Sequence, residues 1–137
     1  MALNKIKKLI DSAQKTIQVA SYTFTHMDLC DALIRAHKRG VHVQVLFDKE
    51  SSNYTSQKVF QKLKKAHIQV YTRTIQGLMH HKFSLIDNEY LITGSANWTK
   101  AAFSINDDIS MFIYPITNPQ KNFMKKNWDE MMCHSTM

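Results

Sequence analysis

A chain of 137 residues with 44% hydrophobic and 21% charged residues has the size and composition of one globular, soluble domain. Its 18 basic and 11 acidic residues leave a formal net charge of +7, which favours polyanionic partners such as nucleic acid or an anionic membrane surface. No apolar run approaches the ~20 residues of a membrane span, and charged residues interrupt the first segment where a signal peptide would lie. The compartment stays open, and a periplasmic or secreted location is the alternative if an upstream signal segment has been removed.

The first part of the chain alternates between helical and strand-like patterns. Hydrophobic residues recur at helical spacing over residues 3–14, with lysines between them, which predicts an amphipathic helix. Residues 16–24 are rich in β-branched and aromatic types, which are typical of a strand. A second helix is predicted from about residue 25 to 39, where Gly40 is well placed to end it, and a second strand over 41–47. This order predicts parallel strands joined by a right-handed crossover.

The remaining elements follow the same logic. They are a polar loop over 49–54, a helix over 55–66, strands over 68–71 and 109–114, a helical turn over 99–102 and a closing helix over 118–132. Together with the strands described next, they predict an α/β fold with a mixed, largely parallel central sheet and helices on both faces. The pattern does not determine the strand order. No linker or repeat divides the chain, so residues 1–137 are expected to form one domain.

A strand, a turn and a second strand are predicted over residues 80–94. His80 and Lys82 are two positions apart, so in a strand they share one face. The next residues are apolar enough to be buried, and Asp87 opens a polar stretch typical of a turn. A second strand-like run then ends at Gly94.

Four polar side chains of this hairpin are expected at one end of the sheet. Ser95 and Asn97 are again two positions apart, and a hairpin would bring their hydroxyl and carboxamide towards His80 and Lys82. A nucleophile, a fixed positive charge and neutral hydrogen-bond donors are the groups that attack on a phosphate diester requires.

The spacing HxKxxxxD that begins at His80, followed by GSxNW over Gly94–Trp98, resembles the signature of the phospholipase D superfamily. The resemblance implies a phospholipase D-like catalytic domain and a phosphodiesterase that needs neither a metal ion nor another cofactor. It is strong from His80 to about Asp108, and elsewhere the elements are only compatible with it.

The resemblance also implies a role for each motif residue. His80 is the expected nucleophile, which forms a phosphohistidine that water resolves. Lys82 is expected to clamp the phosphate, and Ser95 and Asn97 to donate hydrogen bonds to its non-bridging oxygens. His81 faces the other side of the strand and is interpreted as a packing or surface residue.

Two further carboxylates need separate interpretations. Asp87 lies one strand length from His80 and faces away from it, so it is expected to support the fold around the site, as does Gly94. The family usually supplies a Glu after GSxNW that orients the nucleophilic histidine. Asp108 occupies that place here, although its side chain is one methylene shorter, and Asp107 remains the alternative.

The chain holds one copy of a motif that superfamily enzymes use twice, once for the nucleophile and once for the general acid. A two-fold homodimer would supply the second histidine, because a residue near the axis meets its own copy. Relatives with one motif include bacterial endonucleases and the mitochondrial cardiolipin hydrolase. The latter type is associated with a membrane anchor and an upstream Cys/His zinc element, but only Cys30 precedes the motif here. A disulfide between Cys30 and Cys133 is left open.

The sequence therefore predicts a nuclease that cleaves DNA or RNA, with strandedness undecided. The first alternative is a phospholipase acting on an anionic lipid such as cardiolipin, for which Ile75, Leu78 and Met79 are candidates for an apolar rim. The second alternative is a catalytically weak nucleic-acid binder, which the Asp in place of Glu at Asp108 keeps open.

Overall fold

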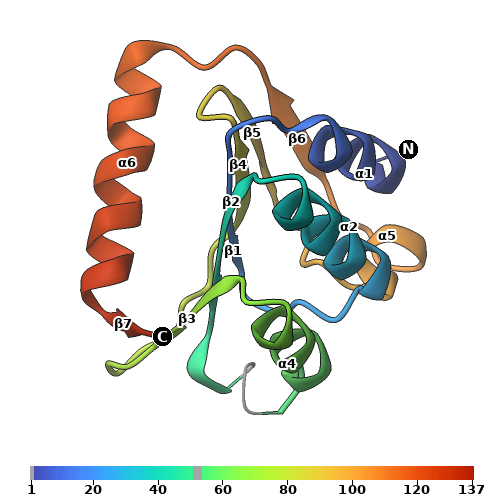
Figure 1. Cartoon of the computed structure of the whole chain (residues 1–137), viewed down its shortest axis with the longest axis vertical. Helices are drawn as coiled ribbons and strands as arrows, with labels where there is room; N and C mark the ends of the chain where they lie inside the picture. Colours follow the sequence, from blue (N-terminus) through green and yellow to red (C-terminus); the bar gives the residue numbers. More distant parts are fainter. Residues whose placement is uncertain (1, 51–53) are drawn as a thin grey trace.

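The computed structural model describes residues 2–50 and 54–137, and these form a seven-stranded sheet with helices on both faces (Figure 1). The strands are β1 (Thr16–Ser21), β2 (His42–Phe47), β3 (Gln69–Arg73), β4 (Lys82–Ile86), β5 (Tyr90–Gly94), β6 (Ser110–Ile113) and β7 (Ser135–Thr136). The helices are α1 (Ala2–Ser12), α2 (Met27–Lys38), α4 (Gln57–Lys65), α5 (Lys100–Ser104) and α6 (Asn118–Cys133). The predicted elements are present, and the short strand β7 is an addition that the sequence did not predict.

The predicted β-α-β unit is confirmed, because β1 pairs with β2 in parallel and α2 connects them. Strand β1 is shorter than predicted and ends at Ser21. The backbone N–H of Thr23 donates to the side chain of Asn97, and Phe24 forms an isolated bridge with Trp98. These bonds draw the chain after Ser21 towards the segment beyond β5, so the strand does not continue to residue 24.

The strand order is β6-β5-β4-β1-β2-β3-β7. Among the described strands, only the pairs β1–β2 and β2–β3 are parallel, and the other neighbours are antiparallel. The sheet is mixed, as predicted, but the prediction that it is largely parallel is wrong. Strand β4 follows β3 without an intervening crossover helix, and the turn Asp87–Glu89 connects β4 directly to β5. A turn this short makes β4 and β5 antiparallel, because a parallel neighbour needs a long crossover, and β4 itself pairs with β1 and not with β3.

Each face of the sheet has its own hydrophobic core. Helices α1, α2 and α4 pack on one face, where Ile10, Leu33 and Leu63 are fully buried against strand residues such as Val19. Helix α6 covers the opposite face, where Trp128 packs edge-on against Phe83 of β4 (Figure 1). The two layers hold the strands from both sides and so fix the end of the sheet at which the motif residues lie.

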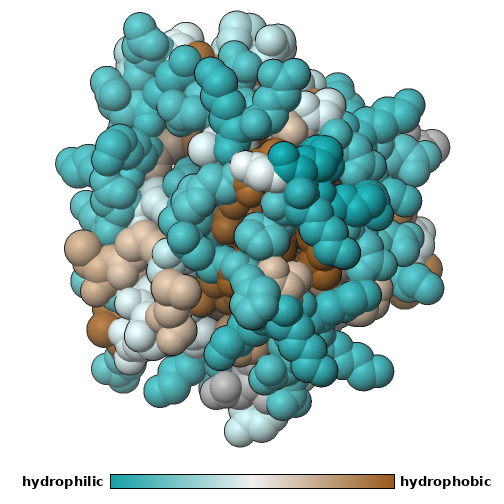
Figure 2. Space-filling view, in the orientation of Figure 1, coloured by the Kyte–Doolittle hydropathy of each residue, from teal (hydrophilic) through white to brown (hydrophobic). Residues whose placement is uncertain are grey.

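Most of the surface seen in Figure 2 is hydrophilic, and hydrophobic atoms show mainly in a recess near its centre. No described helix is long and apolar enough to cross a membrane. The cysteines are both free, with Cys30 buried in α2 and Cys133 exposed at the end of α6, on opposite faces of the sheet. The disulfide that the sequence left open is therefore absent.

Local differences from the prediction concern loops and helix ends. Lys49 and Glu50 of the predicted polar loop over 49–54 are helical, and residues 51–53 of that loop lie outside the described residues. Helix α6 begins as predicted at residue 118, because Thr117 and Gln120 form a capping box around it.

Candidate active site

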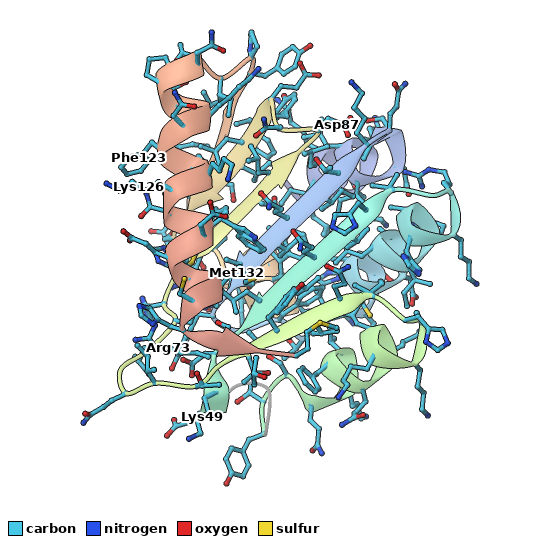
Figure 3. All side chains as sticks on the ribbon, turned by 60° about the vertical axis from the view of Figure 1, so that its left-hand side comes forward. Lys49, Arg73, Asp87, Phe123, Lys126 and Met132 are labelled. Atoms are coloured by element: carbon cyan, nitrogen blue, oxygen red, sulfur yellow. The ribbon has the colours of Figure 1, made fainter. Side chains whose placement is uncertain are left out.

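His80 lies immediately before β4, at the end of the sheet opposite the Asp87 turn. The loop that delivers it starts after Arg73, and Figure 3 shows Arg73 and Asp87 at opposite ends of the sheet. The imidazole is exposed, and its ring centroid lies 4.6 Å from that of Tyr22, with the two planes tilted by 49°. His80 is therefore accessible to a substrate while one flank of its ring is covered.

The ammonium group of Lys82 lies directly beside this imidazole. Its Nζ is 3.3 Å from Nδ1 and 3.5 Å from Nε2 of His80, and it donates a hydrogen bond of 3.2 Å to the backbone oxygen of the same residue. The prediction that these side chains share a face is confirmed, although the regular strand starts only at Lys82. Desolvation lowers the pKa of Lys82 from its usual value of 10.5, and the negative charge of Asp108 partly opposes this.

Ser95 and Asp108 form a second pair at the site. The Ser95 hydroxyl donates a hydrogen bond of 2.7 Å to Oδ1 of Asp108 and accepts one of 3.0 Å from the backbone N–H of Ile109. Within the described residues, no hydrogen bond joins Asp108 to His80. The shorter Asp side chain thus reaches Ser95, whereas the family resemblance led us to expect a carboxylate oriented towards the histidine. Asp107 is exposed and makes no ion pair in the described part of the chain.

Gly94 makes the approach of these two segments possible. Its φ is +152°, a conformation that L side chains rarely adopt, and a Cβ atom there would overlap the carbonyl oxygen of Ile109. That oxygen accepts a hydrogen bond of 3.0 Å from the N–H of Ser95. The absence of a side chain at Gly94 therefore lets the end of β5 lie against the start of β6, which places Ser95 beside Asp108.

Asn97 is held by the chain that follows β1. Its Oδ1 accepts a hydrogen bond of 3.1 Å from the backbone N–H of Thr23, and the N–H of the next residue, Trp98, donates to the carbonyl oxygen of Thr23. Since the oxygen of the carboxamide is engaged, the amide nitrogen is the end that can donate to a substrate.

Asp87 is at the far end of β4 from His80 and makes structural contacts. Its carboxylate accepts hydrogen bonds of 2.7–3.2 Å from the backbone N–H groups of Gln14, Lys15 and Thr16. These bonds connect the end of α1 and the start of β1 to the β4–β5 turn. Asp87, the third residue of the motif, therefore stabilises the fold and does not face the site.

His81 points away from His80, as its position predicted. Its ring packs edge-on against Phe83, with a centroid distance of 6.0 Å. Burial lowers the pKa of His81 from 6.5, and the neighbouring charges of His80, Lys82 and Arg73 lower it further.

Two residues at the site were missed by the sequence analysis. Tyr22 contacts both His80 and Lys82, but it was interpreted only as part of a strand. The carboxylate of Asp48 is 1% exposed and accepts a hydrogen bond of 2.8 Å from the N–H of Met79, the residue before His80. Position after a strand was the signal available for both, since β1 and β2 end at Ser21 and Phe47.

The site contains no group of metal ligands. In the described ranges, no cluster of three His, Cys, Asp or Glu side chains is placed to hold a metal ion. Its polar groups are one imidazole, one ammonium, one hydroxyl–carboxylate pair and one carboxamide, which can together bind and attack a phosphate ester.

Comparisons with known proteins find relatives that match most of this chain. The family model described as "Cardiolipin synthase, PLD-like domain" matches residues 6–131. A mitochondrial cardiolipin hydrolase of Chlamydomonas reinhardtii is 30% identical over 131 residues, which are 93% of this chain and 58% of the relative.

Two solved structures superimpose on 98% of this chain, and the matched part makes up 89% of each of those chains. The phospholipase D family member Nuc from Salmonella typhimurium has a TM-score of 0.91 at 27% identity, and NucT from Helicobacter pylori has a TM-score of 0.89 at 28% identity. The chain spans about half the length of the curated relatives that it matches.

Proposed function

This chain belongs to the phospholipase D superfamily, and from that membership we propose that it is a metal-independent phosphodiesterase that cleaves nucleic acid through a phosphohistidine intermediate. The observation that carries the proposal is the position of the Lys82 ammonium, 3.3 Å from the His80 imidazole. A phosphate whose oxygens bind this ammonium would have its phosphorus atom within reach of an imidazole nitrogen, which is the nucleophile.

The proposed reaction has two steps. In the first, a nitrogen of His80 forms a bond to phosphorus while the bond from phosphorus to the leaving oxygen breaks, and a general acid protonates that oxygen. In the second, water attacks phosphorus, gives its proton to the group that acted as acid, and releases His80. Lys82 stays bound to the non-bridging oxygens and offsets the negative charge that accumulates on them in both transition states.

A second copy of the chain would supply the acid. The motif occurs once in the sequence, and among the described histidines it is His80 whose ring nitrogens lie within hydrogen-bonding distance of a lysine ammonium. In a two-fold dimer with His80 near the axis, His80 of one copy attacks while His80 of the other protonates the leaving oxygen. The homodimer is thus part of the proposal, because the site lacks an acid without it.

Ser95, Asp108 and Asn97 complete the proposed site. The Asn97 amide donates to a non-bridging oxygen. The Ser95 hydroxyl donates a hydrogen bond to Asp108, and the negative charge of Asp108 partly opposes the desolvation that lowers the pKa of Lys82. This assignment differs from the expected contact between Asp108 and His80, and it follows from the hydrogen bond of 2.7 Å.

The net charge supports a polyanionic substrate such as nucleic acid. The excess of 18 basic over 11 acidic residues attracts nucleic acid along its length, and it attracts an anionic membrane surface as well, so cleavage assays must separate the two substrates. The test is to incubate the protein with single- and double-stranded DNA and RNA in EDTA, with His80→Ala as the control. Absence of cleavage of all four substrates by a folded protein of confirmed dimeric state would contradict the proposal.

A second candidate, a phospholipase acting on anionic lipid, has one observation in its favour. Ile75 and Leu78, in the loop that leads to His80, are 43% and 54% exposed. They could contact acyl chains, and the C. reinhardtii relative is named a cardiolipin hydrolase. Met79, the third predicted rim residue, is 2% exposed and contributes to the core instead. Release of lipid products from cardiolipin vesicles, measured beside the nuclease rates, distinguishes the two candidates.

The remaining candidate is a nucleic-acid binder without significant catalysis. It predicts that the parent protein binds oligonucleotides in EDTA and releases no product over long incubation. Product release that is lost in His80→Ala would eliminate it.

A further inference from the structure

One aromatic side chain flanks both of the catalytic groups proposed above. The ring of Tyr22 has its centroid 4.6 Å from that of His80, and the Nζ of Lys82 lies 5.5 Å from the centroid of Tyr22. Both distances are within the range of favourable aromatic and cation–π contacts. Tyr22 is therefore the described side chain that contacts the expected nucleophile and the expected phosphate clamp together.

The backbone of Tyr22 is fixed by the two halves of the motif. Its N–H donates a hydrogen bond of 3.0 Å to the carbonyl oxygen of His81, which extends the pairing of β1 with β4 beyond Ser21. The next residue, Thr23, donates its N–H to Asn97. The position of the tyrosine ring thus depends on the same bonds that place the motif residues.

Contact with an aromatic ring has two consequences for an attacking imidazole. The ring covers one flank of His80 and so restricts rotation of the imidazole, which would otherwise be free because the residue is exposed and precedes the strand. It also presents a π-system to the positive charge that develops on the imidazole when one nitrogen bonds to phosphorus and the other keeps its proton. Both effects act more on the transition state than on substrate binding.

We propose that Tyr22 is a positioning residue of this active site, whose ring holds the His80 imidazole in its attacking orientation and stabilises the charge that forms on it. The proposal rests on the proposed phosphodiesterase function and assigns the role to the aromatic ring, not to the hydroxyl. Ring contact alone accounts for the geometry, because the structure shows no hydrogen bond from the Tyr22 hydroxyl among the described residues.

The test compares variants that keep or remove the ring. Tyr22→Phe should retain kcat within about twofold, and Tyr22→Leu should lower kcat by about tenfold with KM changed less than about threefold. The matched control is Tyr114→Leu, since the Tyr114 ring stacks on Tyr90 at the far end of β5 and should leave both constants unchanged. If Tyr22→Leu does not fold, Tyr22→Met removes the ring with a flexible side chain and takes its place.

A second readout does not depend on activity. The imidazole proton resonances of His80, assigned by their absence in His80→Ala, should be displaced by the ring current of Tyr22. They should stay displaced in Tyr22→Phe and move towards the free-histidine position in Tyr22→Leu. If the parent cleaves no phosphodiester, the proposed function fails, and this shift would still support the positioning of the ring. Unchanged resonances in Tyr22→Leu, or a parental kcat in that variant, would overturn the proposal.

Discussion

The hydroxyl of Ser95 donates a hydrogen bond of 2.7 Å to Oδ1 of Asp108. This bond joins a residue that precedes α5 in the sequence to one that follows it. Desolvation lowers the pKa of Lys82, and the negative charge of Asp108 partly opposes this shift. The carboxylate that the family resemblance associates with the histidine is therefore, in this structure, associated with the serine and the lysine. This arrangement leads to the first prediction.

Phosphate binding should weaken at a lower pH than an ordinary lysine would allow. Because the pKa of Lys82 lies below 10.5, the ammonium loses its proton, and with it its attraction for phosphate, before that pH is reached. As the pH is raised, KM for an oligonucleotide should therefore begin to increase at a pH below 10.5. In Asp108→Asn the rise should occur at still lower pH, because the opposing charge is removed. Lys82→Arg is the control: its guanidinium stays charged, so the rise should disappear.

His80→Ala should lower kcat by about 10³-fold or more, because a shared site loses the nucleophile from one copy and the acid from the other. A mixed dimer of parent and His80→Ala chains is the sharper experiment, since its single site needs both histidines. It should be as inactive in full turnover as the pure variant. Half of the parental activity in purified mixed dimers would show that each chain contains an independent site, and His81 would then be the first alternative acid to examine.

Asp87→Ala should destabilise the protein without altering the catalysis of the folded fraction. Its carboxylate binds three backbone N–H groups between α1 and β1, and charge-assisted bonds of this kind contribute about 2 kcal/mol. Asp87→Asn, which keeps an acceptor but loses the charge, should cost less. Urea unfolding measures the free energies. A fall in kcat for folded Asp87→Asn would instead place this residue in the reaction.

Gly94→Ala should be more destabilising than Gly40→Ala. Both glycines have positive φ, so each alanine pays a conformational cost of about 1–2 kcal/mol. Only at Gly94 would the new Cβ also overlap a backbone carbonyl, that of Ile109, whereas nothing lies within 4 Å at Gly40. The extra displacement should also separate Ser95 from Asp108 and lower activity. Equal unfolding free energies for the two variants would mean that the end of β5 and the start of β6 can move apart at little cost in free energy.

The two cysteines should differ in reactivity. Burial raises the pKa of Cys30 to about 11, so at pH 8 it is protonated as well as inaccessible, whereas Cys133 is exposed. Iodoacetamide at pH 8 should add one group per native chain, and none to Cys133→Ser. Modification of both thiols should require denaturant. A second adduct on the native protein would indicate that α2 opens readily.

The sequence alone was sufficient for the family, for most elements and for the identity of the motif residues. His80 and Lys82 share a face because strand geometry has a period of two, and this holds wherever the strand lies. The same parity placed His81 and Asp87 away from the site. Local rules of this kind need no knowledge of neighbouring strands, which is why they transferred directly to the structure.

Only the tertiary structure decided which distant segments meet. The antiparallel pairing of β4 with β1 made the sheet mixed and brought the chain after β1, with Tyr22 and Thr23, between His80 and Asn97. Asp108 bonds to Ser95 because β5 and β6 come close together at Gly94. The length of the Asp side chain, which is all that the sequence shows, does not reveal this contact. Contacts between strands depend on their order and register, and these result from packing against α6 and the helices on the opposite face, so no local pattern specifies them.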